Sequence, residues 1–165
     1  MKKIVALALL CFLGFLAVIS QDVNAQNSAS AVLKDFMRAS KMDGQNLTFV
    51  LINDKTLDLL FGASDSAGKD SIKAGASQGT AFFVFGVAEN DTAINYKFSV
   101  EQDGLIYSCV SKNIENFDGS NVAKGQKIKG ILQLEKKLNL NRPFVIKSSS
   151  NKLEFKLSQQ ALRQM

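Results

Sequence analysis

The chain has 165 residues, a formal net charge of +5, and neither histidine nor tryptophan. This length suffices for one domain with its own hydrophobic core and leaves little room for a second. The lack of histidine argues against serine-histidine catalysis and against an ordinary zinc site.

The first twenty-five residues predict a cleaved signal peptide. Two lysines precede an uncharged apolar run from Ile4 to Ser20, and Ala25 supplies a small residue before the predicted cut. This run approaches the length of a spanning helix, about 20 apolar residues, so an uncleaved anchor is the alternative. We expect an exported protein, secreted or periplasmic, in which residues 26–165 form a single domain with no transmembrane span. Cleavage would leave Cys109 as the sole cysteine, so no internal disulfide is expected.

An amphipathic helix is predicted from about Ala29 to Met42. Serines near its start can cap it, and Gly44 follows its end. Its charged side chains fall on one face, and its apolar side chains fall on the other: Val32, Leu33, Phe36 and Met37. Such a helix can pack on a sheet or lie on a membrane surface.

After residue 46 the pattern changes to the alternation that is typical of strands. Residues 47–53 and 56–62 predict a hairpin, with Leu57, Leu59 and Phe61 on one side of its second strand. Residues 62–79 repeat glycine and serine and predict a long loop. Residues 80–87 are apolar on both faces, as expected for a central strand that is covered on both sides.

Residues 93–101 alternate cleanly and predict a strand with one buried face. Asp103 and Gly104 then supply the residues that a two-residue type I′ hairpin turn prefers. This turn would set Gln102 opposite Leu105, Val100 opposite Tyr107, and Phe98 opposite Cys109. Cys109 is therefore expected on the core side, where it acts as a small hydrophobe without a base to activate it.

Residues 112–126 predict a second long connection. Residues 127–135 fit either a helix or a strand, and the strand is preferred because it places Ile128, Leu132 and Leu134 on one face. Residues 143–149 and 152–158 predict a last hairpin, followed by a polar tail. The whole pattern predicts a mainly β domain, in which the N-terminal amphipathic helix precedes about eight mostly antiparallel strands that form a sandwich or a small barrel.

No motif predicts a catalytic residue, a metal site or a cofactor. Residues 62–70 fail the phosphate-loop pattern, because the glycines are one residue too far apart and Asp70 replaces the hydroxyl that would bind magnesium. Asp65 and Asp70 do not follow the ligand order of an EF-hand. Asp58 is interpreted as a solvent-facing residue on an alternating strand.

The charge distribution is the strongest functional signal. Residues 26–111 hold seven basic and ten acidic side chains, a balance of −3, whereas residues 112–165 hold eleven basic and four acidic side chains, a balance of +7. Six basic residues are expected to share a face or rim that binds an anionic partner: Lys124, Lys127, Lys129, Lys136, Lys137 and Arg142. Such a surface attracts anionic lipid, polysaccharide or acidic protein. Nucleic acid is disfavoured, since no aromatic side chains alternate with these lysines.

These features predict an exported, non-enzymatic binding or structural module that contacts an anionic surface or partner through its basic C-terminal part. Three alternatives remain, besides a merely solvated basic face. One is a barrel-shaped carrier of a small apolar ligand, lined by residues such as Phe83, Phe85, Tyr96 and Phe98. Another is a membrane-active protein that detaches its N-terminal helix. The last is an enzyme that uses carboxylates alone.

Overall fold

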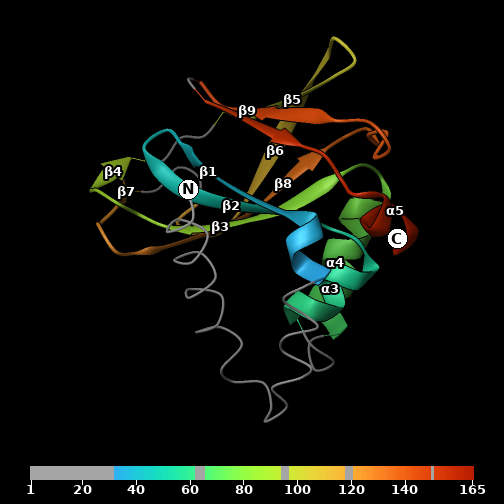
Figure 1. The fold of residues 1–165 in the computed structure, drawn as a ribbon. Coiled ribbons are helices and arrows are strands. Elements are labelled where there is room, and N and C mark those ends of the chain that lie inside the picture. The colour runs from blue at the N-terminus through green and yellow to red at the C-terminus, as the bar shows by residue number, and fades with distance from the viewer. Residues whose placement is uncertain (1–31, 62–65, 94–96, 118–120, 150) are drawn as a thin grey trace.

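The computed structural model describes residues 32–61, 66–93, 97–117, 121–149 and 151–165. An eight-stranded antiparallel sheet curves into a nearly closed barrel (Figure 1). Its strands, in spatial order, are β1 (Met37–Met42), β2 (Gln45–Leu51), β3 (Ala81–Val87), β8 (Lys127–Leu134), β6 (Leu105–Glu115), β5 (Ser99–Gln102), β9 (Phe144–Lys147) and β10 (Lys152–Phe155). A second, two-stranded ladder pairs β4 (Thr92–Ala93) with β7 (Asn121–Val122). The helices are α3 (Asp54–Phe61), α4 (Ser66–Ser77) and α5 (Gln159–Arg163), and residues 32–36 add one helical turn.

The predicted mainly β, antiparallel fold class is confirmed. The strand at residues 80–87 is β3, which lies between β2 and β8. The Asp103–Gly104 turn forms with the expected register, since Gln102 pairs with Leu105 and Val100 with Tyr107. The strand preferred for residues 127–135 is β8, and the last hairpin is β9–β10. Residues 94–96 of the predicted strand 93–101 lie outside the described residues.

Phenylalanine fills the inside of the barrel. Within the described ranges, six phenylalanine side chains are fully buried: Phe36, Phe49, Phe82, Phe117, Phe144 and Phe155. The rings of Phe144 and Phe155 stack with their centroids 5.1 Å apart, and Phe98 stacks on Phe117 at 6.2 Å. Large buried aromatic side chains contribute more hydrophobic stabilisation than any other residue type. The inward face of the sheet is therefore the main core.

The strand predicted for residues 56–62 is wrong, because this segment forms α3. Asn53 Oδ1 accepts a hydrogen bond from the backbone N–H of Thr56 at 2.8 Å, and Thr56 Oγ1 accepts one from the N–H of Asn53 at 2.9 Å. This reciprocal pair satisfies N–H groups at the helix start that would otherwise lack partners. With helical spacing, Leu57 and Leu60 are both buried. Asp58 remains exposed, as expected, although it lies on a helix.

The long loop predicted for residues 62–79 is also wrong, because residues 66–77 form α4 beside α3. Lys69 pairs with Asp58 at 3.0 Å, and Lys73 pairs with Asp54 at 2.8 Å. Ile72 and Ala76 pack against the apolar cluster under α3. The two helices therefore cover the outer face of β2 and β3, where Phe61 meets Phe83 edge-on at 6.0 Å.

The predicted helix from Ala29 to Met42 is wrong beyond residue 36. Its first residues, 29–31, lie outside the described residues, and residues 32–36 are helical. Met37–Met42 form β1, which pairs with β2 through a turn at Asp43 and Gly44. These two residues have φ of 47° and 82°, close to the 52° and 78° of Asp103 and Gly104. Positive φ at both positions is the requirement of a type I′ hairpin turn.

The chain after β10 is more ordered than its polar composition predicts. Ser158 caps α5 by accepting a hydrogen bond from the N–H of Ala161 at 3.0 Å. Ala161 is fully buried, and Leu157 and Ala161 belong to the main core. The predicted polar tail is therefore a short helix that packs against the barrel.

Strands β1 and β10 meet where the barrel nearly closes. Arg38 Nη2 donates to Lys156 O at one end of this seam, and the N–H of Asp43 donates to Asn151 Oδ1 at 3.0 Å at the other end. Both contacts fit one antiparallel register. The guanidinium of Arg38 also donates to Met37 O at 2.7 Å and Lys34 O at 3.2 Å. Burial lowers the pKa of this group, and Asp35 partly opposes the shift.

Candidate functional site: the exposed face of strand β6

Strand β6 carries most of the exposed apolar side chains in the described part of the chain. Among the described residues, five large apolar side chains are more than half exposed, and four of these five belong to β6. They are Leu105 (60%), Ile106 (67%), Val110 (53%) and Ile114 (51%). The fifth is Met165, at the end of the chain. Scattered apolar residues are normal on protein surfaces, whereas a set on one strand indicates a contact surface.

Three of these side chains form a line. Ile106 and Val110 alternate with Tyr107 and Cys109, which pack against the main core, so they point away from the barrel. Ile114 is exposed at a β-bulge, where the pairing with β8 shifts between Asn113 and Glu115. Ile114 lies eight positions after Ile106, which at 3.3 Å per residue is at most about 26 Å along the strand. We call the outward side chains of β6, from Ile106 to Ile114, the β6 face.

The described helices do not reach the β6 face. On the adjacent strand β8, Ile131 is partly buried against the cluster that includes Ile72 and Ala76 of α4. The next residue across the sheet is Lys112 of β6, which pairs with Ile131 and is exposed. The helical cover therefore ends at β8, and β6 is the first strand beyond it.

Basic side chains surround the β6 face. Lys112 lies on it, between Val110 and Ile114. The neighbouring strand β8 contributes Lys127 and Lys129, which alternate with the buried Ile128 and Gly130. Exposed lysines also precede β5 and follow β8: Lys97, Lys136 and Lys137. Among the described residues, Lys129 pairs with Glu115 at 3.0 Å, whereas these other lysines have no carboxylate within ion-pair distance.

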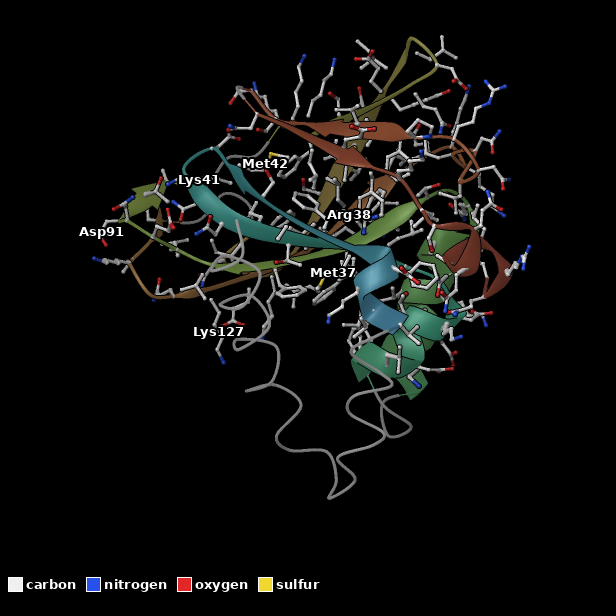
Figure 2. All side chains as sticks on the ribbon, in the orientation of Figure 1. Met37, Arg38, Lys41, Met42, Asp91 and Lys127 are labelled. Carbon is white, nitrogen blue, oxygen red and sulfur yellow. The ribbon has the colours of Figure 1, made fainter. Side chains whose placement is uncertain are left out.

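The six basic residues predicted to form one site lie in two groups. Lys124, Lys127 and Lys129 are at the start of β8, and Lys136, Lys137 and Arg142 follow its end. The seven steps from Lys127 to Leu134 span about 23 Å. Figure 2 shows Lys127 at the end of the barrel away from the β5–β6 turn. The two groups flank the β6 face at its two ends, and a common anionic partner for all six residues stays a prediction.

The loop that carries the second group is held in place from both sides. The N–H of Leu138 donates to Thr80 Oγ1 at 2.8 Å. Gln102 and Asn139 exchange two hydrogen bonds of 2.9 Å, side chain to backbone in both directions. Arg142 pairs with Asp103 of the β5–β6 turn at 3.0 Å. Lys136 and Lys137 therefore extend from a fixed backbone beside β6.

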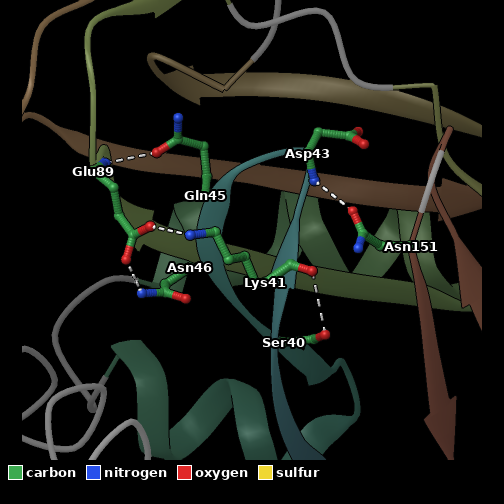
Figure 3. Close-up of polar contacts among 7 residues, drawn as sticks. All are labelled: Ser40, Lys41, Asp43, Gln45, Asn46, Glu89 and Asn151. Carbon is green, nitrogen blue, oxygen red and sulfur yellow. Dashed lines mark hydrogen bonds and ion pairs between the residues drawn. The ribbon is translucent and has the colours of Figure 1, made fainter.

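A polar cluster at the β1–β2 turn has a structural role instead (Figure 3). The Glu89 carboxylate accepts from Lys41 Nζ at 2.8 Å and from the side-chain amide of Asn46, while its N–H donates to Gln45 Oε1 at 2.7 Å. These bonds fasten the segment after β3 to the first hairpin. Both oxygens of the Glu89 carboxylate are thus engaged within the protein. The Asp43 carboxylate at the same turn accepts from the hydroxyls of Ser148 and Ser149.

Cys109 lies on the core side, as predicted. Its N–H donates to Phe98 O at 3.3 Å, which continues the predicted register. Burial raises the pKa of its thiol to about 12, so the nucleophilic thiolate is suppressed at neutral pH. Within the described residues, no three acidic, cysteine or histidine side chains are close enough to hold a metal ion. Asp70 is exposed on α4, and Asp65 lies outside those residues.

The residues predicted to line a carrier cavity do not share one space. Phe83 and Phe85 lie on the outer face and pack in the cluster with Phe61 of α3. Phe98 lies inside, with its ring 5.7 Å from that of Phe49. Tyr96 lies outside the described residues.

Comparisons with protein-family models, with curated proteins and with solved structures found no match to this chain. Among the described residues, no helix combines the length and the apolar content needed to cross a bilayer.

The apolar part of the β6 face is the feature that sequence reasoning missed. One signal was present, because two adjacent apolar residues, Leu105 and Ile106, follow a tight turn. Adjacent side chains on a strand point to opposite faces, so one of the pair had to face away from the core. Without the strand order, the pattern gave no indication of whether another element covers it.

Proposed function

We propose that this protein is an exported, non-enzymatic binding module whose β6 face docks on an anionic partner. The observation that supports this proposal is the combination of an exposed apolar line on β6 with lysines on and beside that strand. Apolar side chains supply contact area, and the surrounding cations supply attraction and orientation.

The local charge balance favours an anionic partner. Three of the acidic residues near β6 are paired within the protein: Glu115 with Lys129, Glu101 with Lys147, and Asp103 with Arg142. Glu135, which is exposed directly after β8, offsets one of the surrounding lysines. Lys97, Lys112, Lys127, Lys136 and Lys137 then remain in excess around the strand. Because these side chains are exposed, their attraction for an anion weakens with added salt.

Retention on a heparin column, with elution by a salt gradient, tests this proposal. The β6 variant carries Lys112→Gln, Lys127→Gln and Lys136→Gln. The matched control carries Lys34→Gln, Lys73→Gln and Arg163→Gln, which removes the same charge from exposed positions on the first helical turn, α4 and α5.

We expect the β6 variant to elute at distinctly lower salt than the control, which should elute close to the unmodified protein. Equal elution of the two variants would mean that only net charge matters, and it would refute a β6 site. An unmodified protein that is not retained would refute the proposal as well.

A further inference from the structure

We infer that the anionic partner of the β6 face is a phospholipid bilayer, on which β6 lies lengthwise with its aliphatic side chains in the headgroup region. This inference rests on the proposed function and names the partner. Peripheral proteins bind such surfaces by combining apolar side chains at the interface with basic side chains that reach anionic lipids.

The composition of the face argues for lipid over sugar polymers and nucleic acid. Its large outward side chains are aliphatic, whereas Tyr107, the aromatic residue of β6, packs against the core. Bases, like other planar ligands, are bound by stacking on exposed aromatic rings. Aliphatic side chains favour acyl chains instead, and lysines can extend their ammonium groups to phosphates while their stems lie along apolar surface.

A second copy of this chain is a poor occupant of the face. Across a two-fold axis, the same surface faces itself. Lys112 lies between Val110 and Ile114, and Lys127 lies on the adjacent strand, so self-association would bring like charges together. Anionic headgroups remove this repulsion.

The shape of the face also fits a planar partner. The outer surface of a barrel is convex, so a planar surface can approach β6, whose exposed apolar residues extend over at most about 26 Å. Lys112 lies among these residues, with Lys127 and Lys136 near opposite ends of β8. The contact needs no pocket on either side, in contrast to the buried anchors of most protein partners.

Single tryptophan reporters test the orientation, because the chain has no tryptophan of its own. Ile106→Trp, Val110→Trp and Ile114→Trp place the reporter along β6. Met165→Trp is the control, since Met165 is, among the described residues, the one comparably exposed large apolar residue away from β6. Emission is recorded with vesicles of phosphatidylglycerol and phosphatidylcholine and with vesicles of phosphatidylcholine alone.

We expect the three β6 reporters to shift to shorter wavelength with the anionic vesicles, and to be quenched by brominated lipid, while the control stays unshifted. A shift of the Ile106→Trp reporter alone would mean insertion of the turn only and would overturn the lengthwise contact. Shifts of all four reporters, or of none, would overturn it as well. Any contribution of residues 1–25 to vesicle binding is common to all four chains.

A second pair of variants separates this inference from the proposed function. Val110→Ser with Ile114→Ser should weaken binding to anionic vesicles roughly tenfold, since each change removes apolar area from the contact. The same double variant should keep its retention on heparin, and Met165→Ser should change neither property. If the double variant kept its retention on heparin and bound anionic vesicles as tightly as the unmodified protein, the bilayer would be rejected as the partner. The proposed anionic site would then still stand.

Discussion

The guanidinium carbon of Arg38 lies 5.2 Å from the centre of the Phe155 ring, across the seam between β1 and β10. The same guanidinium donates hydrogen bonds to backbone carbonyls on both sides of the seam, including Lys156 O. The planar guanidinium carries several N–H donors and suits this position. A single side chain thereby donates to backbone carbonyls that receive no hydrogen bond from the opposite strand at the seam.

Replacement of Arg38 by Met should therefore destabilise the fold by roughly 2–4 kcal/mol, since it removes charge-assisted hydrogen bonds and the cation–π contact together. Arg38→Lys should recover only part of this loss, because an ammonium lacks the planar fork. Urea unfolding measures both changes. Arg163→Met, at an exposed position of α5, is the control, and a loss of equal size there would contradict a special role for Arg38.

Gly130 allows Phe117 to pack directly on β8. A Cβ at Gly130 would lie 2.0 Å from Phe117 Cδ1 and 2.2 Å from Phe117 Cγ. Gly130→Ala should thus cost about 1–3 kcal/mol of unfolding free energy through overpacking. Adding Phe117→Leu to the Gly130→Ala variant should lower the free energy of unfolding by less than the same change does in the unmodified protein. Strict additivity of the two changes in thermal unfolding would count against the contact.

The turn at Asp43 and Gly44 should tolerate Asn better than Ala at its second position. Gly44 has φ of 82° and no atom near the position of a Cβ, so the cost of a side chain there is conformational. We expect Gly44→Ala to destabilise by about 1 kcal/mol and Gly44→Asn by distinctly less. Comparable melting temperatures for the two variants would show that this turn does not require positive φ.

The Cys109 thiol should react slowly in the folded protein. Its pKa of about 12 keeps it protonated at pH 8, whereas the unfolded thiol titrates near its ordinary value of 9.0. Alkylation in a Cys11→Ser background should therefore be much faster in denaturant than in buffer. Because the unfolded state loses this proton first, stability should fall as pH rises from about 9 towards 12. A Cys109→Ala variant should lack this part of the pH dependence, and an unchanged alkaline profile would refute the assignment.

Glu101 should make stability depend on pH in the acid range. A hydrogen bond from Lys147, together with its charge, lowers the pKa of Glu101 below the ordinary value of 4.5. Stability from this pair is present above that value and is lost as pH falls through the lower, folded-state pKa. Glu101→Gln should flatten the stability profile below pH 4.5, by a small amount because the pair is near the surface. Glu154→Gln, on β10, which β9 separates from β5, serves as the comparison.

Local pattern predicted the strands well where one face is buried and the other is wet. The register of β5 with β6 followed from the Asp103–Gly104 turn, because a two-residue turn leaves no freedom in pairing. The same dipeptide at residues 43–44 fits the end of a helix as well, since Val32, Leu33, Phe36 and Met37 have helical spacing. Pairing with β2, a tertiary interaction, decided between the two.

The helices α3 and α4 were missed for a different reason. Leu57, Leu59 and Phe61 fit alternation, and Leu57, Leu60 and Phe61 fit a helix equally well, so period alone did not distinguish them. The reciprocal hydrogen bonds of Asn53 and Thr56 were the deciding signal. For the candidate site, composition located the excess of lysine, but only the strand order revealed that the lysines surround an uncovered apolar strand.

The closing contacts of the barrel join residues far apart in the chain, because Lys156 follows Arg38 by 118 positions and Asn151 follows Asp43 by 108. During synthesis β1 emerges long before its neighbour at the seam, so a nascent chain keeps one edge of its sheet unprotected until its last strand is made. Loss of residues 151–165 should leave that edge open permanently, and misassembly between chains is then the expected fate of truncated products.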